Sequence, residues 1–402
     1  LNALYTRLDS QSISFILEHA ETKVLISDTE YASIISEALK QVDHDILVID
    51  YQDPEISYGK AIGSIEYEEF LNEGDTRLSL LPPDSEWDAI SLNYTSGTTG
   101  NPKGVELTHD NFAFITNQVV DLIVPLDRHD NYISWLPQAH SFGQVCDNHA
   151  FTVMGLNMTT VRNPLDIIDY AKEIQPDFFV GVPRIYEKVY SNVRAAIDSK
   201  PVIRIGLQVP LLKAVLAKAI RRKAGFLNCK HAITGAAPIN PEIIQLFHSI
   251  GINIYEAYGL TETSAGMTFN WKGNNKTGSI GVPCTGTEVR IEDDGELSFK
   301  GRNIMKGYYN NPEANAEVFD GDWFKTGDLG RMDEDGYIHI TGRKKEIYVS
   351  SGGKNVAPLV IEETMKSIPV LSQVFLVGDL SLIHISEPTR RRGISYAVFC
   401  LK

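Results

Sequence analysis

The sequence predicts an α/β protein with a large N-terminal domain of parallel sheets and flanking helices, a β-rich subdomain, and the start of a truncated α+β C-terminal domain. Two observations predict this order. Up to residue 256, short apolar strand-like runs alternate with helix-like segments, as in parallel sheets covered by helices. After about residue 281, hairpins with glycine turns replace that alternation. We therefore divide the chain into residues 1–281, 282–342, 343–379 and 380–402.

The first α/β unit begins at once. Asp9 or Ser10 can cap a helix because each offers a side-chain oxygen to the first turn. The expected apolar face of this helix consists of Ile13, Ile16 and Leu17. A strand at 23–27, a helix at 29–42 and a second strand at 45–50 are expected to follow. Because the chain opens at Leu1 inside this unit, we expect the core 1–281 to be truncated at its N-terminus.

The alternation then continues through the core. Five further strands are expected at 132–136, 158–161, 178–182, 231–234 and 253–256. Three helices are expected at 166–174, 184–197 and 241–250. Two hairpins with Asp-Gly in the turn are then expected at 288–300 and 331–341.

Composition excludes several classes of protein. The 402 residues are 43% hydrophobic and 22% charged, as in soluble globular domains, and the net charge is −15. That acidity argues against a nucleic-acid partner and against wholesale binding to an anionic membrane. No apolar run approaches the ~18 residues of a membrane helix. Four widely spaced cysteines fit a reducing, cytoplasmic compartment and neither a disulfide framework nor a zinc site.

The last 23 residues, 380–402, resemble the conceptual translation of a sequencing-library adapter. Their first eleven residues match a transposon end with its primer site, and their last nine match a flow-cell primer region. We therefore expect this tail to be non-native and to pack poorly.

The strongest chemical signal is the glycine-rich loop Tyr94-Thr-Ser-Gly-Thr-Thr-Gly-Asn-Pro-Lys-Gly104. Its glycines let backbone N–H groups approach phosphate oxygens, its hydroxyls add donors, and Lys103 adds a positive charge. Pro102 before the lysine and Gly104 after it exclude a Walker A motif. A polar surface loop is the structural alternative, but eleven residues in this order are far more specific than a short glycine motif.

At this loop the sequence resembles the adenylate-forming (AMP-binding) superfamily of acyl-CoA synthetases, luciferases and peptide-synthetase adenylation domains. The resemblance covers most of residues 1–379. Four further motifs carry it: Gly235-Ala-Ala-Pro238, Tyr255-Glu-Ala-Tyr-Gly-Leu-Thr-Glu-Thr263, Trp323-Phe-Lys-Thr-Gly-Asp328 and Gly342-Arg-Lys-Lys-Glu346. Taken singly, these residues have structural explanations such as a solvated carboxylate or a turn. Their joint occurrence in the family's order favours function.

The resemblance implies ATP, Mg²⁺ and coenzyme A. Tyr258 would stack on adenine, Asp328 would accept the ribose hydroxyls, and Arg343 would lie near ribose and phosphate, with Lys345 as the pivot of a domain hinge. Glu262 would bind the metal, with Thr95 as a second ligand. The implied catalytic residues are Lys103, Thr261, Glu262 and His140. The implied nucleotide-binding residues are Thr95, Ser96, Gly97, Thr98, Thr99, Gly100, Lys103, Gly235, Ala236, Ala237, Glu256, Tyr258, Gly259, Thr261, Asp328 and Arg343.

Within the superfamily, Leu136–Phe142, Val182–Val189 and Gly342–Pro358 look most like the long-chain-fatty-acid–CoA ligases. His140 would then border the carboxylate end of the acyl site; a structural histidine at a strand end is the alternative. Residues 1–93 look more like the medium-chain and aryl branch. A chimera joined at the glycine-rich loop and a lineage of mixed features both remain open.

One departure concerns the C-terminal part. The family's mobile Gly-Lys motif has no counterpart after Arg343, because Lys354 lies too close to the hinge. The Arg221-Arg-Lys223 run could contact CoA phosphates, but a solvated helix end explains it better.

The sequence thus predicts a fragment of an enzyme that converts a fatty acid to acyl-adenylate and then acyl-CoA. It is expected to be impaired, to be cytoplasmic, and to be compatible with peripheral membrane contact. A medium-chain or aryl acid–CoA ligase, or a nucleotide-binding fragment without turnover, is the alternative. Its partners would be fatty acid, ATP and CoA, and its oligomeric state is open.

Overall fold

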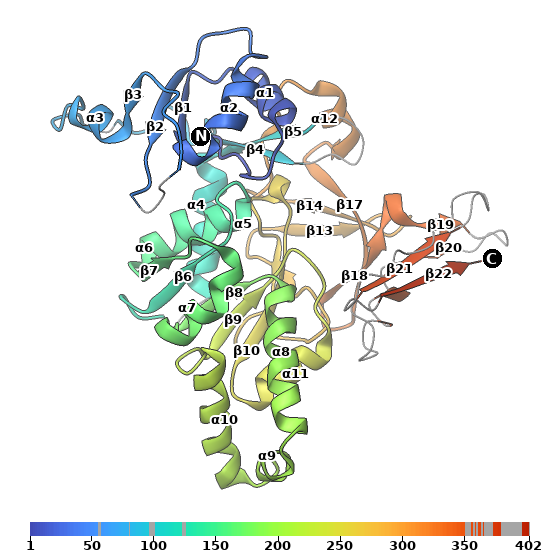
Figure 1. The fold of residues 1–402 in the computed structure, drawn as a ribbon. Helices are drawn as coiled ribbons and strands as arrows, with labels where there is room; N and C mark the ends of the chain where they lie inside the picture. The colour runs from blue at the N-terminus through green and yellow to red at the C-terminus, as the bar shows by residue number, and fades with distance from the viewer. Residues whose placement is uncertain are drawn as a thin grey trace.

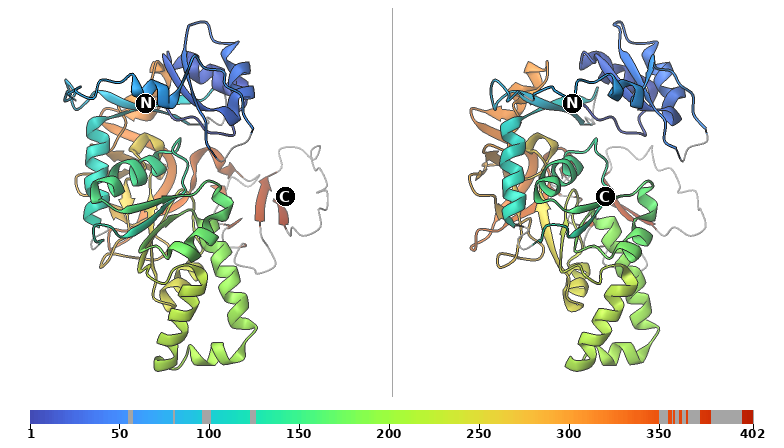
Figure 2. Two further views of the ribbon diagram at one scale, coloured as in Figure 1. Left: turned by 60° about the vertical axis from the view of Figure 1, so that its left-hand side comes forward. Right: turned by 90° about the vertical axis from the view of Figure 1, so that its left-hand side faces the viewer.

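The computed structural model describes residues 1–54, 58–79, 81–95, 101–122 and 126–349, with shorter pieces beyond (355–356, 358, 361–362, 365, 373–378 and 396–401). An N-terminal α/β unit lies at one end, a sheet with covering helices lies in the middle, and a β-rich region lies beside it (Figure 1, Figure 2). No helix in these described ranges is long and apolar enough to cross a membrane.

The N-terminal unit confirms its predicted order. Strands β1 (Val24–Asp28), β2 (Leu47–Tyr51) and β3 (Ile65–Glu66) form a parallel sheet, with helices α1 (Ser10–His19), α2 (Ala32–Leu39) and α3 (Tyr67–Asn72). Asp9 caps α1 by accepting a hydrogen bond from the Ser12 N–H at 2.7 Å. The unit has a small core of its own, made by Ile13, Leu17, Leu25, Ile35 and Ala38.

A three-stranded antiparallel sheet carries the glycine-rich loop at its first turn. β4 (Ala89–Thr95) pairs with β5 (Lys103–Thr108), and β5 pairs on its other side with β15 (Gly307–Tyr308). The register places Thr95 opposite Lys103 and Tyr308 opposite Val105. Helix α4 (His109–Leu122) follows β5 directly. The sequence analysis did not anticipate this hairpin.

The central sheet has the order β12-β11-β10-β9-β8. The three predicted strands, β8 (Phe178–Gly181), β9 (His231–Thr234) and β10 (Asn253–Tyr258), are parallel as expected. β11 (Thr268–Phe269) and β12 (Val282–Pro283) extend the sheet in antiparallel fashion. Its helices are α7 (Ile167–Ile174), α8 (Pro183–Asp198) and α11 (Pro241–Ser249).

The predicted strands before β8 form a separate parallel pair, β6 (Asn131–Ser134) with β7 (Asn157–Thr160). The chain between them is helical, in the order α5 (Ser141–Gly143), the π-helix η2 (Gln144–Phe151) and α6 (Thr152–Met154). The sequence analysis did not predict these helices.

Helices α8, α9 (Pro201–Gly206) and α10 (Pro210–Ala224) reach beyond the sheets as a projection, which is visible in every view (Figure 1, Figure 2). Phe179, Tyr186, Phe226 and Phe247 pack edge to face where this projection joins the central sheet. The projection is therefore anchored to the central sheet by packed aromatic rings.

The β-rich region contains both predicted hairpins. It consists of β13 (Glu288–Ile291), β14 (Glu296–Lys300), β16 (Phe319–Asp320), β17 (Trp323–Met332) and β18 (Ile338–Arg343), with helix α12 (Pro312–Val318). β12 and β15 follow the predicted boundary at residue 281, yet each completes a sheet whose other members precede it. One hydrophobic core, including Val105, Val180, Leu297 and Phe324, joins these regions. The sheets that carry the predicted motifs are thus held together by shared packing.

Beyond β18, the chain forms the short helix η5 (Lys344–Glu346) and the strand pairs β19 (Tyr348–Val349) with β20 (Asn355–Val356) and β21 (Gln373–Gly378) with β22 (Tyr396–Leu401). Six residues of the tail form β22, which pairs in parallel with β21, and the expectation that the tail packs poorly stays a prediction. A run of apolar residues can pair with any open strand edge, whatever its origin.

Candidate active site

The loop lysine and the acidic residue of the central motif meet at one tyrosine. The Tyr308 hydroxyl donates a hydrogen bond to Oε1 of Glu262 at 2.8 Å. The Lys103 Nζ lies 4.8 Å from the centroid of the same tyrosine ring, at the distance of a cation–π contact. Burial and the Glu262 carboxylate raise the pKa of Tyr308, so its hydroxyl remains a hydrogen-bond donor. The structure therefore brings Lys103 and Glu262 together around Tyr308.

Backbone geometry fixes the position of Glu262. The turn after β10 folds back so closely that a Cβ on Gly259 would lie 2.3 Å from the Ala265 carbonyl group, which only glycine avoids. Thr263 Oγ1 accepts a hydrogen bond from the Leu260 N–H at 2.9 Å, and the Met305 N–H donates to the Glu262 carbonyl at 2.8 Å. Thr261 opens the short helix η4 (Thr261–Thr263) of this turn. The predicted α-phosphate and metal residues thus lie on a rigid turn.

A second cluster joins Tyr258, Asp328 and Arg343. The Tyr258 hydroxyl donates to Oδ2 of Asp328 at 2.5 Å, and the Arg343 Nε lies 3.0 Å from Oδ1. Asp328 and Arg343 are direct partners in the β17–β18 ladder. Burial raises the pKa of Asp328, while the tyrosine hydroxyl and the guanidinium act in the opposite direction. Asp328, the residue predicted to bind the ribose, therefore already has one protein partner at each of its carboxylate oxygens. Each partner uses one lone pair of its oxygen.

The segment Gly235–Ala237 follows the end of β9, as predicted. A Cβ on Gly235 would lie 3.1 Å from the Ala257 carbonyl oxygen and 3.9 Å from the Phe142 ring. Ala236 adopts a left-handed backbone with φ of +68°. This strand end therefore lies close both to β10 and to the segment that carries His140.

His140 is the N-cap of α5. Its Nδ1 accepts a hydrogen bond from the Phe142 N–H at 3.1 Å, and burial lowers its pKa. Because Nδ1 is an acceptor, the neutral ring carries its proton on Nε2. His140 thus has the capping role of the structural alternative and keeps an Nε2–H that could donate to a substrate.

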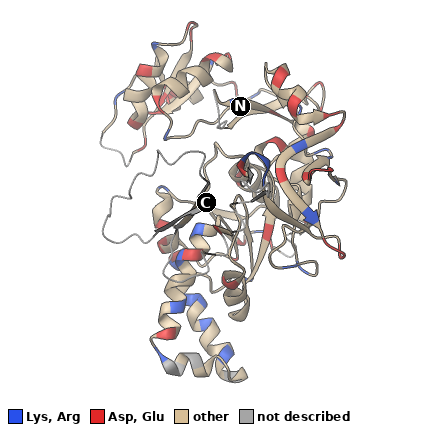
Figure 3. Ribbon diagram, turned by 90° about the vertical axis from the view of Figure 1, so that its right-hand side faces the viewer, with Lys and Arg blue, Asp and Glu red and all other residues tan. Residues whose placement is uncertain are grey.

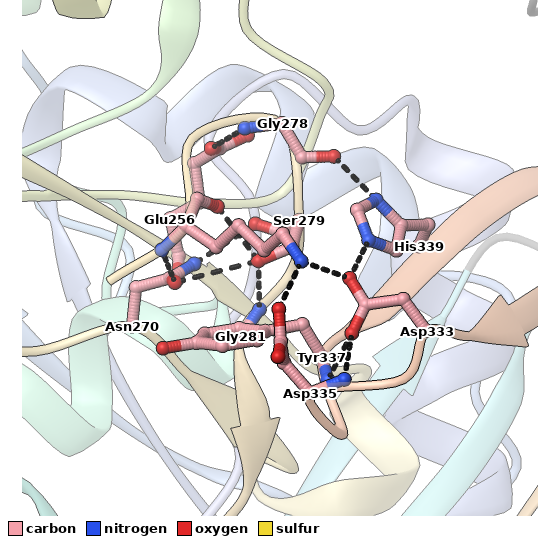
Figure 4. Close-up of polar contacts among 10 residues, drawn as sticks. Glu256, Asn270, Gly278, Ser279, Gly281, Asp333, Asp335, Tyr337 and His339 are labelled. Carbon is pink, nitrogen blue, oxygen red and sulfur yellow. Dashed lines mark hydrogen bonds and ion pairs between the residues drawn. The ribbon is translucent and has the colours of Figure 1, made fainter. Parts of the chain in front are cut away.

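Glu256 lies on β10 at the edge of a polar cluster (Figure 4). Its Oε2 accepts from the Gly278 N–H at 2.8 Å, and burial raises its pKa to about 7. The Gly278 carbonyl faces Nδ1 of His339 at 3.0 Å, while the histidine Nε2 lies 2.8 Å from Oδ2 of Asp333. Both histidine nitrogens therefore lie within hydrogen-bond distance of an acceptor. Glu256 is thus tied to the β17–β18 hairpin.

Several predicted residues have other outcomes. Ser96, Gly97, Thr98, Thr99 and Gly100 lie outside the described residues. Thr95 lies at the end of β4, and no hydrogen bond joins it to Glu262 within the described ranges. Tyr308 was missed because it stands in no recognised motif; the aromatic pair in Gly307-Tyr-Tyr309 was the available signal. No group of three His, Cys, Asp or Glu side chains suited to a metal occurs among the described residues.

The chain is similar to known proteins over most of its length. Residues 1–309 match the protein family described as AMP-binding enzyme. The long-chain-fatty-acid–CoA ligase FadD15 of Mycobacterium bovis is 33% identical over 407 residues, covering 94% of this chain and 66% of the relative. The long-chain-fatty-acid–CoA ligase ACSBG2 of Homo sapiens is 28% identical over 417 residues, covering 94% of this chain and 62% of the relative. The chain thus spans just under two thirds of the length of these two relatives.

Solved structures agree on the fold. The anthranilate CoA ligase AuaEII, in complex with anthranoyl-AMP, aligns with a TM-score of 0.74 at 19% identity, covering 93% of this chain and 71% of that one. The O-succinylbenzoate coenzyme A synthetase of Bacillus subtilis, with ATP and magnesium, aligns with a TM-score of 0.69 at 21% identity, covering 93% and 73%. These structures share the fold of the chain, and the match over residues 1–309 shows that the chain belongs to the AMP-binding enzyme family.

Proposed function

We propose that this chain takes part in the ATP-dependent activation of a fatty acid. The acid carboxylate would attack the α-phosphorus of ATP, forming acyl-adenylate and releasing pyrophosphate. The thiol of coenzyme A would then attack the acyl carbonyl, forming the thioester and releasing AMP. The name of the FadD15 relative and the family match support this assignment.

The observation that carries the proposal is the meeting of Lys103 and Glu262 at Tyr308. Transfer at phosphorus needs little covalent chemistry from the protein, so positioning and charge neutralisation dominate. Lys103, at the start of β5 directly after the glycine-rich loop, would neutralise the charge of a phosphate oxygen. Tyr308 would keep this charge at a fixed distance from the Glu262 carboxylate.

The residues present suit Mg²⁺, which would neutralise phosphate charge when bound. Magnesium takes one or two carboxylates and fills its remaining positions with phosphate oxygens and water, so it needs no cluster of acidic side chains. Glu262 would provide the carboxylate, since Tyr308 uses only one of its oxygens. Thr95 would provide a hydroxyl from the end of β4.

The nucleoside end would lie at Tyr258 and Asp328. The remaining lone pairs of the Asp328 carboxylate would accept the ribose hydroxyls, and Arg343 would stay between this carboxylate and a phosphate. We place the protein in the cytoplasm, with fatty acid, ATP and coenzyme A as its small-molecule partners. A medium-chain or aryl acid is the alternative substrate.

An acid panel tests the proposal. We expect pyrophosphate release from ATP with palmitate, and affinity that rises with the length of an aliphatic acid because each buried CH₂ contributes ~0.8 kcal/mol. A preference for benzoate over palmitate would favour the aryl alternative. ATP binding without pyrophosphate release on any acid would leave a nucleotide-binding protein without turnover.

A further inference from the structure

The projection formed by α8, α9 and α10 carries an unusual distribution of charge. Between Asp198 and Glu242 the chain contains eight Lys and Arg residues and no Asp or Glu, although the net charge of the whole protein is −15. Six of these eight cations lie in α9 and α10, the part of the protein farthest from the N-terminal unit (Figure 1). Lys and Arg mark the projecting helices in the charge view (Figure 3).

This projection also exposes apolar side chains. Among its residues whose burial the structure describes, Ile205 is 60% exposed, Val209 42%, Leu212 52% and Val215 67%. They come from the end of α9, the turn after it and the first turns of α10. Four exposed aliphatic side chains within residues 205–215, interspersed with polar residues, are a feature of surfaces that bind a partner.

Helical spacing places cations beside these aliphatic groups. Lys218 and Arg222 are three and seven residues after Val215, so all three share the face of α10 opposite the buried Ala217. Both cations are exposed, and neither forms an ion pair with a carboxylate in the described part of the chain. Their charge is therefore available to an external anion.

We propose that the tip surface, defined as Ile205, Val209, Leu212, Val215, Lys218 and Arg222, docks the protein on a membrane that contains anionic phospholipid. Exposed aliphatic side chains can enter the boundary between headgroups and acyl chains of such a membrane, while the long side chains of neighbouring Lys and Arg extend to its anionic headgroups. The acidic protein as a whole would be repelled, which leaves this tip as the contact. The sequence analysis found the chain compatible with peripheral membrane contact; this inference names the surface that would make the contact, and it does not depend on the proposed chemistry.

The composition of the tip favours lipid over other polyanions. Nucleic-acid surfaces combine cations with aromatic rings that stack on bases, whereas residues 199–224 contain no Phe, Tyr or Trp. The phosphates of free coenzyme A would engage Lys218 and Arg222 but would leave four aliphatic side chains in water.

Vesicle co-sedimentation of the full chain tests the proposal. We expect binding to vesicles of equal phosphatidylcholine and phosphatidylglycerol, weakening as salt screens the charges, and little binding to phosphatidylcholine alone. The double variant Lys218→Glu with Arg222→Glu should weaken the partition coefficient by at least about 25-fold, at about fivefold for each cation removed. Leu212→Ser with Val215→Ser should weaken binding to the same vesicles while leaving its salt dependence in place.

Lys40→Glu with Lys60→Glu is the matched control, since both are exposed lysines of the N-terminal unit with the same change of charge. Equal loss in the control and in the tip variant would overturn the proposal, as would absence of wild-type binding or preferential binding to RNA. Pyrophosphate release with octanoate, without vesicles, should be unchanged in both tip variants. Vesicle binding without pyrophosphate release would contradict only the proposed chemistry. Pyrophosphate release without vesicle binding would contradict only the proposed docking surface.

Discussion

Tyr308 donates its hydroxyl hydrogen to the carboxylate of Glu262 across 46 positions of sequence, while its backbone pairs with the strand that begins at Lys103. One residue therefore controls two distances: that from β5 to the acidic turn, and that from the lysine charge to an aromatic face. Neither Lys103 nor Glu262 can move away from the other without breaking a contact to Tyr308.

Replacing Tyr308 by Phe separates these two functions. The variant keeps the ring under Lys103 but loses the hydrogen bond to Glu262. Because a hydrogen bond to a charged group contributes about 1.5–3 kcal/mol, we expect the KM for MgATP to rise by about tenfold or more. Tyr309→Phe is the matched control, since that hydroxyl faces Glu21 at 3.3 Å, outside the site. Equal effects of the two variants on MgATP kinetics would exclude a positioning role.

Lys103→Ala and Glu262→Gln should each lower pyrophosphate release at low ATP concentration by about 100-fold, the usual effect of removing one preorganised charge partner. Thermal unfolding should change little, because neither side chain belongs to the hydrophobic core. Lys306→Ala removes an exposed lysine close by and should leave release unchanged. If either site variant matched wild type at low ATP, its residue would lose its assigned role.

His140 allows its two ring nitrogens to be tested separately. His140→Asn keeps a capping acceptor for the Phe142 N–H and so should preserve the melting temperature, but it removes the Nε2–H and should lower turnover. His140→Phe removes both and should cost about 1 kcal/mol of stability in addition. Unchanged turnover in His140→Asn would reduce this residue to its capping role.

The raised pKa of Glu256 leads us to expect that the free energy of unfolding depends on pH. Its pKa is raised from the ordinary 4.5 to about 7, so the folded chain binds this proton more tightly than the unfolded chain. The stabilising contribution is therefore present below about pH 4.5 and is lost as pH rises toward and through about 7. We expect this loss to be about 2 kcal/mol, reduced from the full shift because the side chain is partly exposed.

Urea denaturation across this pH range measures the effect as the difference between wild type and Glu256→Gln. Glu242→Gln, at an exposed glutamate of α11, is the control and should follow wild type. A wild-type profile that runs parallel to that of Glu256→Gln would show that the carboxyl titrates alike in the folded and unfolded chains.

The sequence predicted those strands that can be recognised from a few consecutive residues. The strand at His231–Thr234 and the hairpin strands Glu288–Ile291 and Glu296–Lys300 appear with the expected bounds. Each is short, is bounded by turn residues, and depends on its own alternation or apolar run. The motifs likewise predicted the neighbourhood of Asp328 and Arg343, which one hairpin brings together.

Long-range pairing could not be predicted in this way. Nothing local to Gly307–Tyr308 indicates that two residues will add a strand beside β5, about 200 positions earlier. The contact of Gly278 with Glu256 likewise depends on where a loop crosses the sheet. The residue types were visible in the sequence, but their partners were set by the packing of distant segments.

The position of β5 inside its sheet also sets the order of assembly. β4 covers one edge of β5 as soon as the hairpin forms, but the other edge waits for residues 307–308 to be synthesised. The side-chain amide of Asn111 likewise donates to the carbonyls of Arg302 and Ile304, 191 and 193 positions later, so it gains these partners only when that segment has been made. A nascent chain that has not reached this segment exposes an unpaired strand edge next to apolar core residues, which is a hazard for aggregation. Closure of this ladder joins residues about 200 positions apart, so it is a high-contact-order step that we expect late in folding.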